Sequence, residues 1–355
     1  MNTIIRRPTR QIRLGKLAIG GDAPISIQSM LCVPTANVEA AARQIAQLEK
    51  AGCEIIRFSV MNQADADAIP ALKRMAAVPL VADIHFDHKL ALAALEAGID
   101  GLRINPGNIG SREKVAEVVR LAAERGVPIR IGVNSGSLPR ELVAKYGVSA
   151  KAMVEAALSH VHILEELNFT AIKISVKASQ LPLMLESYRA LSRKVDYPLH
   201  LGITEAGTLL AGSIKSAMAL GILLNEGIGD TIRVSLTADP LQEVMVARRI
   251  LQNLGLRRGL NIISCPTCGR TRINLMRLAD EVESALAEFA DRPLTVAVMG
   301  CVVNGPGEAR EADFGLAGGD GEGLVFARGE IVSKVPEDKL VPELLRLIRE
   351  HFNHA

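Results

Sequence analysis

A chain of 355 residues is longer than one hydrophobic core usually supports, so we expect two domains. Its hydrophobic content of 48% and mean hydropathy of +0.22 exclude an intrinsically disordered protein. A net charge of +2, no tryptophan and three tyrosines argue against a nucleic-acid partner. No apolar run approaches the ~18 residues of a membrane span.

The amino-terminal segment is basic but has no apolar stretch after it, so it does not resemble a signal peptide. We expect it to form a short polar hairpin that caps the first domain. Five cysteines, two of them in a Cys-x2-Cys, indicate metal or redox chemistry in a reducing compartment. We therefore expect a cytoplasmic protein.

Eight apolar, β-branched runs follow one another in the first 254 residues, and helical segments such as Val38–Lys50 separate them. The segment near 66–75 is the weakest helix. The runs are Ile25–Ser29, Ile55–Val60, Leu80–Asp83, Gly101–Ile104, Ile129–Val133, Ala171–Ser175, Leu199–Thr204 and Thr231–Ser235. This alternation predicts an α/β fold, a (β/α)8 TIM barrel over residues 1–254. A doubly wound open sheet is the alternative.

The pattern changes after Leu254, where Gly255–Gly259 reads as a short basic linker. Two strands, two cysteine loops, a glycine-rich hairpin and a terminal helix are expected after it. We therefore predict a second, small α/β domain over residues 259–355.

Polar side chains recur at every second position near the ends of the predicted barrel strands, which places them on one face of each strand. The outer face is covered by helices in a parallel barrel, so these side chains are expected inside, at the carboxyl-terminal mouth. They are Arg57 and Ser59, Asp83 and His85, Arg103 and Asn105, Arg130 and Asn134, Lys173 and Ser175, Thr204 with its neighbour Glu205, and Arg233 and Ser235.

Five cations at one mouth, against Asp83 and Glu205, predict a polyanionic ligand such as a diphosphate. An internal layer of salt bridges is the alternative. Lys173 has a second possible role as the Schiff-base nucleophile of a class I aldolase, which needs no metal. His85 shares a face with Asp83 and is a functional candidate, whereas His200, Cys32 and Cys53 also fit a buried structural role.

Three cysteines in the second domain form the other candidate site. Cys265 and Cys268 make the Cys-x2-Cys, and Cys301 precedes Glu308 by seven residues. Thiolates select zinc or iron–sulfur clusters, and three thiolates with a carboxylate suggest a reactive centre, since a structural site is normally closed by four good ligands. A zinc-dependent hydrolase and a non-catalytic iron–sulfur carrier remain alternatives.

Nine motifs in order resemble the family of 4-hydroxy-3-methylbut-2-enyl diphosphate synthases of the methylerythritol phosphate route to isoprenoids, in its two-domain bacterial form. They are residues 27–30 (IQSM), 79–87 (PLVADIHFD), 102–110 (LRINPGNIG), 129–134 (IRIGVN), 173–179 (KISVKAS), 199–207 (LHLGITEAG), 227–235 (GIGDTIRVS), 265–268 (CPTC) and 300–308 (GCVVNGPGE). The loop Leu31–Asn37 departs from the family pattern.

The resemblance implies a [4Fe–4S] cluster on Cys265, Cys268, Cys301 and Glu308. It also implies a barrel that binds 2-C-methyl-D-erythritol 2,4-cyclodiphosphate, a homodimer, and flavodoxin or ferredoxin as the electron donor. On this hypothesis the barrel cations with Asn105, Asn134, Ser175, Thr204 and Ser235 bind the substrate. Glu205 donates a proton, Asp83 and His85 orient the polyol, and Asn304 acts beside the weak ligand Glu308.

Overall fold

The structure is a computed structural model that describes residues 4–105, 109–301 and 311–353. The chain divides into two compact units, Met1–Leu254 and Gly255–Ala355, and each unit has buried apolar clusters of its own. No helix within the described ranges is long and apolar enough to cross a membrane.

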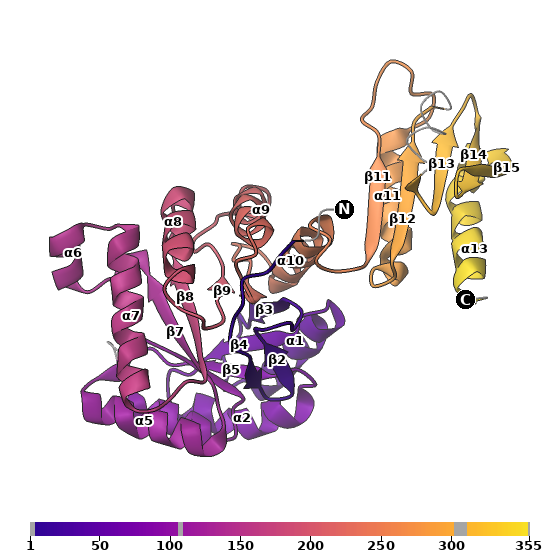
Figure 1. Cartoon of the computed structure of the whole chain (residues 1–355). Coiled ribbons are helices and arrows are strands. Elements are labelled where there is room, and N and C mark those ends of the chain that lie inside the picture. Colours follow the sequence, from indigo (N-terminus) through magenta and orange to yellow (C-terminus); the bar gives the residue numbers. More distant parts are fainter. Residues whose placement is uncertain (1–3, 106–108, 302–310, 354–355) are drawn as a thin grey trace. The chain divides into compact units, whose positions relative to one another are not determined.

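The first unit is a barrel of eight parallel strands with helices outside it (Figure 1). The strands are β3 (Ser26–Met30), β4 (Ile55–Ser59), β5 (Leu80–Asp83), β6 (Gly101–Ile104), β7 (Ile129–Asn134), β8 (Ile172–Lys177), β9 (His200–Leu201) and β10 (Thr231–Ile232). Strand order runs from β8 back to β3 and then through β10 to β9. A bridge between Ile174 and Leu199 closes the ring, which confirms the predicted TIM barrel.

Amphipathic helices cover the outer face of this barrel because the buried strands leave no polar face for solvent. They are α1 (Val38–Lys50), α2 (Gln63–Met75), α3 (His88–Glu96), α5 (Arg112–Arg125), α6 (Arg140–Tyr146), α7 (Ala150–Glu166), α8 (Leu181–Ser192), α9 (Leu209–Asn225) and α10 (Pro240–Asn253), with the 3-10 turn Ser135–Ser137 after β7. The segment expected to be weak is the full helix α2, since Asn62 caps it by accepting from the Asp65 amide. Helix α6 was not predicted.

The amino-terminal hairpin is apolar where a polar one was predicted. Strands β1 (Ile12–Leu14) and β2 (Leu17–Ile19) pair in antiparallel fashion. Ile12, Leu14 and Ile19 are buried against Ile55 of β4 and Val81 of β5. The alternation of apolar and polar residues in these short strands was obscured by the basic residues around them. The apolar face of the hairpin closes the amino-terminal end of the barrel.

Strands β9 and β10 are shorter than the runs predicted for them. After β9 the chain leaves the sheet at once, and Glu205 takes a φ of 53° in the following turn. A non-glycine residue is uncommon there, so the turn is held in place by its surroundings.

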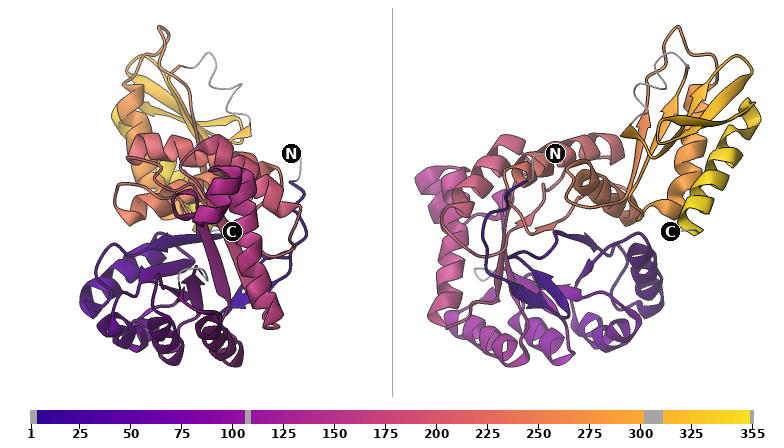
Figure 2. Two further views of the ribbon diagram at one scale, coloured as in Figure 1. Left: turned by 90° about the vertical axis from the view of Figure 1, so that its left-hand side faces the viewer. Right: turned by 45° about the vertical axis from the view of Figure 1, so that its right-hand side comes forward.

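The second unit is a five-stranded sheet in the order β11 (Leu260–Ser264), β12 (Leu294–Met299), β13 (Phe314–Gly318), β14 (Glu322–Ala327) and β15 (Glu330–Pro336). Helices α11 (Leu275–Ala285) and α13 (Leu340–Asn353) lie together on one face of this sheet (Figure 2). The 3-10 turns Leu286–Phe289 and Glu337–Lys339 complete the unit. Its core joins the apolar stripes of both helices to Val296, Val298 and Leu316.

Asp230 ties the amino-terminal segment to the barrel. Its carboxylate accepts from Arg6 at 2.9 Å, from the Thr9 hydroxyl at 3.1 Å and from the Leu199 amide at 2.8 Å. The side chain is almost fully buried. Removing it leaves a partly buried arginine and a buried amide without their acceptor.

We expect Asp230→Ala to lower the free energy of unfolding of the barrel by roughly 3 kcal/mol, because it breaks a largely buried ion pair. Asp196→Ala is the matched control, since it removes the exposed partner of Arg10 and should cost less than about 1 kcal/mol. Urea unfolding followed by tyrosine fluorescence reports on this unit alone, because all three tyrosines lie in it. Equal losses in the two variants would contradict the expectation.

Candidate functional site

The polar residues predicted to face inward do share one face of the strands. Strand register places Asp83 beside Arg103, Arg103 beside Arg130, and Arg130 beside Lys173. All four side chains are at least nine-tenths buried. The structure therefore brings the predicted cations together inside the barrel.

Asp83 is the central anion of this cluster. Arg103 donates to it at 3.0 Å, Arg57 lies 3.6 Å from its other oxygen, and His85 lies 3.5 Å away. Burial by itself would raise the pKa of Asp83, but Arg57, the His85 hydrogen bond and Arg103 outweigh burial and hold that pKa far below its usual value. Asp83 is therefore ionised, and it offsets part of the positive charge.

Arg130 has no carboxylate partner among the described residues. Its Nη1 donates to the Ser175 hydroxyl at 3.0 Å, while its Nε and Nη2 are buried without a hydrogen-bond partner in the described part of the chain. Burial, then Arg57 and Arg103, lower its pKa well below the usual arginine value. An unmatched buried guanidinium is costly unless an anion binds it.

Arg233 has a partner that the sequence did not reveal. Glu243, on the covering helix α10, lies 3.4 Å from Arg233 and accepts from the Ser29 hydroxyl at 2.9 Å. Strand alternation cannot find such a residue because it comes from a helix. Salt bridges therefore account for part of the barrel interior, as the alternative interpretation proposed, but they leave Arg130 unmatched.

Lys177 is a further cation that sequence reasoning missed. It is the last residue of β8, two positions beyond Ser175 on the same inward face, and it is paired in register with Asn134. The predicted strand ended at Ser175, which left Lys177 outside the pattern. Burial, then Arg130 and Arg233, lower its pKa well below the usual lysine value.

Two inward glycines make room for the long cations. A Cβ on Gly132 would lie 2.7 Å from the Arg103 Nε, and a Cβ on Gly202 would lie 2.6 Å from the Lys177 Nζ. Side chains at these positions would push the cations from their places. On the inward face, Gly132 of β7 and Gly202 just after β9 therefore leave space that the Arg103 and Lys177 side chains fill.

The remaining barrel candidates lie nearer the rim. Asn105 is buried, whereas Asn134, Thr204 and Ser235 are half-buried and Glu205 is exposed in its strained turn. His85 also keeps 42% of its side chain exposed. The loop Asn105–Gly110 lies partly outside the described residues.

The segment Leu31–Asn37 follows β3 at the same end of the barrel. Thr35 donates to the Ser59 carbonyl at 2.7 Å and Asp65 accepts from the Ala36 amide at 2.9 Å, so the loop is tied to β4 and α2. Cys32 is exposed, which corrects its interpretation as a core residue, and its Sγ lies 2.9 Å from the Gln44 Nε2. Cys53 is buried as predicted, and burial raises its pKa to about 12.

His200 lies inside the barrel and fits the buried structural role. Its Nδ1 lies 2.8 Å from the Thr231 hydroxyl. Burial, then Lys177 and Arg130, keep its pKa well below the usual histidine value, so the ring is neutral.

The three cysteines of the second unit line one pocket, together with Arg270, Thr271 and Met299. The Gly300 amide donates to the Cys265 Sγ at 3.2 Å, and Cys268 is exposed. Asn304 and Glu308 lie outside the described residues. Within the described ranges, no three histidine, cysteine or acidic side chains converge as the ligands of a single metal ion would.

This donor set fits an iron–sulfur cluster better than a single zinc ion. Ligands of one zinc converge to within about 2.3 Å of a point, whereas a cluster spreads its thiolates around several iron atoms. Three thiols around one pocket, with a backbone amide donating to a sulfur, suit the second arrangement.

The comparisons with known proteins cover both units. Residues 9–248 match the GcpE TIM-barrel domain and residues 261–350 match the GcpE protein C-terminal domain. The 4-hydroxy-3-methylbut-2-en-1-yl diphosphate synthase (flavodoxin) of Geobacter sulfurreducens is 60% identical over 98% of this chain and 99% of its own length. The protein of the same name from Clostridium perfringens is 56% identical over 97% of this chain and 99% of its own length.

Among solved structures, 3-dehydroquinate dehydratase from Geobacillus kaustophilus superimposes with a TM-score of 0.51 over 71% of this chain and 98% of its own length. At 15% sequence identity this likeness shows the barrel fold alone. The near-full-length relatives and the two matched domains show more than the fold. Because both units match, the chain belongs to the GcpE family.

Proposed function

We propose that this protein is a flavodoxin-dependent 4-hydroxy-3-methylbut-2-en-1-yl diphosphate synthase. It would convert 2-C-methyl-D-erythritol 2,4-cyclodiphosphate into 4-hydroxy-3-methylbut-2-enyl diphosphate with two electrons and two protons, opening the ring and releasing water. The observation that carries the proposal is the excess of buried cations inside the barrel, where Arg130 has no carboxylate partner among the described residues, in a family of that name. An anion with two phosphates would supply the missing negative charge.

Within this proposal the barrel cations bind and orient the cyclic diphosphate. Arg57, Arg103, Arg130, Arg233 and Lys177 would hold phosphate oxygens, with Asn105, Asn134, Ser175, Thr204 and Ser235 around them. Holding both phosphates fixes the ring and neutralises the charge that develops on the phosphate leaving group. Asp83 would keep Arg57 and Arg103 in place and, with His85, orient the polyol.

Glu205 is the proposed proton donor to the departing hydroxyl group. Its exposed position at the mouth and its positive φ both fit a side chain that is aimed by its turn. We propose Asn304 as a hydrogen-bonding residue on the cysteine side of the reaction.

Cys265, Cys268, Cys301 and Glu308 would hold a [4Fe–4S] cluster. When bound, that cluster supplies one-electron transfer and a Lewis-acidic iron. Glu308 is the hard ligand in a thiolate set and therefore the most readily exchanged. The exposed, positively charged Arg270 and Arg272 near these cysteines suit an acidic electron carrier, which supports flavodoxin, with ferredoxin as the alternative donor.

The aldolase alternative is disfavoured by the surroundings of Lys173. Its Nζ lies in a cavity with room for about one water molecule, walled by Ile12, Leu14 and Leu102. This space is too small for a carbonyl substrate, which disfavours a Schiff base at Lys173.

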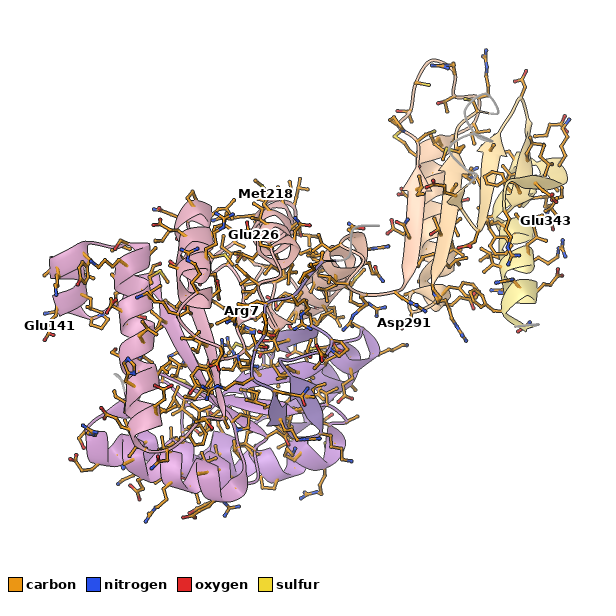
Figure 3. All side chains as sticks on the ribbon, in the orientation of Figure 1. Arg7, Glu141, Met218, Glu226, Asp291 and Glu343 are labelled. Atoms are coloured by element: carbon orange, nitrogen blue, oxygen red, sulfur yellow. The ribbon has the colours of Figure 1, made fainter. Side chains whose placement is uncertain are left out.

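We also propose that the protein is a homodimer. Leu210, Ile214 and Met218 form an exposed apolar stripe on α9, which carries a single charged side chain, Lys215. Figure 3 shows Met218 projecting from the outer side of α9. A two-fold axis through this face would let the stripe pack against its own copy.

The deciding experiment is anaerobic turnover of 2-C-methyl-D-erythritol 2,4-cyclodiphosphate by the reconstituted protein, with dithionite or reduced flavodoxin as the reductant. We expect 4-hydroxy-3-methylbut-2-enyl diphosphate by mass spectrometry, and none from Cys301→Ala. Glu308→Ala should keep much of its iron and sulfide yet lose at least ~100-fold in kcat. A fully loaded protein without product would reject the proposed reaction, and full activity of Glu308→Ala would reject an exchangeable Glu308.

Arg130→Ala should raise KM and lower kcat, with kcat/KM falling by roughly 100-fold or more, because it removes a buried, charge-assisted contact to phosphate. Arg120→Ala, which changes an exposed arginine on α5, is the matched control and should behave as wild type. The assay is steady-state kinetics at equal cluster content. Unchanged kinetics of Arg130→Ala would remove it from the substrate site.

Ile214→Glu should shift the protein from dimer to monomer, because it places a charge at the centre of the apolar stripe. Light scattering after size-exclusion chromatography measures the mass. Lys114→Glu, on α5, is the control and should leave the mass unchanged. A wild-type protein with the mass of one chain, or a dimer that persists in Ile214→Glu, would contradict this interface.

A further inference from the structure

Lys173 lies at a different depth of the barrel from Lys177, although both point inward from β8. Lys173 is paired in register with Arg130 and lines a cavity at the amino-terminal end of the barrel, which the β1–β2 hairpin closes. Lys177 lies four residues further toward the mouth. The two lysines therefore cannot serve the same contact to a ligand.

The cavity beside Lys173 contains several polar atoms that find no partner in the described part of the chain. They are the Lys173 Nζ, both side-chain amide atoms of Gln28, and the Nε and Nη2 of Arg130. Each residue is at least nine-tenths buried. A buried polar atom without a hydrogen-bond partner is unfavourable, so several such atoms around one cavity indicate an occupant.

The cavity has room for about one water molecule, which can pair with some of these polar atoms. A buried water needs about two to four polar partners. It can accept from Lys173 or Arg130 and donate to the Gln28 carbonyl oxygen. Arg130 connects the cavity to the strand residues nearer the mouth, because it lines the cavity and its Nη1 donates to the Ser175 hydroxyl.

The charges around Lys173 oppose its protonation in the absence of ligand. Arg130 on β7 and Arg57 on β4 are cations, Asp230 before β10 is the opposing anion, His200 on β9 is neutral, and Gln28 on β3 is uncharged. The hairpin contributes only apolar side chains to the cavity. Burial first, and Arg130 second, lower the pKa of Lys173 to about 7.

We propose that Lys173 is a proton acceptor that lies beneath the diphosphate site and does not itself bind the diphosphate. One internal water links it to Gln28 and Arg130, and Lys173 takes up a proton when an anion binds above it. Lys173 and Gln28 are then positioning residues that act through Arg130. This inference rests on the proposed anion site but on neither the cluster nor turnover.

The pH dependence of anion binding follows from the pKa change of Lys173. Ligand-free Lys173 is mostly neutral above pH 7, and a bound polyanion raises its pKa by adding negative charge nearby. Protons are therefore taken up on binding between pH 7 and the higher pKa of the complex. Over that range the affinity for the anion rises as the pH falls.

The test is calorimetric titration of the cluster-free protein with inorganic pyrophosphate at pH 8, in buffers of different ionisation enthalpy. The wild type should take up about half to one proton per site more than Lys173→Met. Lys173→Gln, which keeps a polar group in the cavity, should lose the same uptake. Lys151→Met, an exposed lysine on α7, is the matched control and should retain it.

Equal net proton uptake in the wild type and both Lys173 variants would overturn the proposal. The comparison between proteins is needed because pyrophosphate still carries a proton at pH 8 and can release it on binding. Loss of pyrophosphate binding in Lys173→Met at every pH would also overturn it, because it would make Lys173 a direct ligand. Thermal melting of each variant identifies a misfolded protein. Uptake that depends on Lys173, in a protein without synthase activity, would sustain this inference and reject the proposed function alone.

Discussion

The sharing of Asp83 between Arg57 and Arg103 is the interaction on which the barrel interior depends. One carboxylate with a strongly lowered pKa holds two guanidinium groups in a largely buried space. Because Asp83 is already engaged by two cations, it offsets little of the charge of Arg130 or Lys177. The folded barrel is therefore built with positive charge in excess of its local partners, and it is best stabilised when an anion is bound.

This excess charge also explains why glycines occur among the inward-facing residues of the barrel. Cations can stand side by side in register only where neighbouring positions are empty, and Gly132 and Gly202 provide that space. The apolar hairpin β1–β2 closes the other end of the barrel and separates the cluster of charges from bulk water. Exclusion of water strengthens every contact that these cations make to an incoming phosphate.

Periodicity predicted the fold and most of the barrel candidates because strand alternation is a strictly local rule. It found Asp83, Arg103 and Arg130 from single strands. It failed where the information is not local. Glu243 reaches Arg233 from a helix, and Lys177 was lost because the end of β8 is set by pairing with β7. The hairpin was wrongly predicted to be polar because a three-residue strand is too short to show a clear alternation of apolar and polar residues.

Lys173 and Lys177 differ in their depth along β8. The sequence pattern alone did not show what surrounds each lysine at that depth. Both are lysines on one face of β8, and both match the pattern of a phosphate ligand. The lower one faces Gln28, Arg130 and apolar walls, while the upper one faces Asn134 and the mouth. Burial and neighbouring cations lower the pKa of both lysines, so their depth in the barrel decides which of them lies nearer the mouth. On the proposals made above, Lys177 would contact the anion and Lys173 would adjust the charge beneath it.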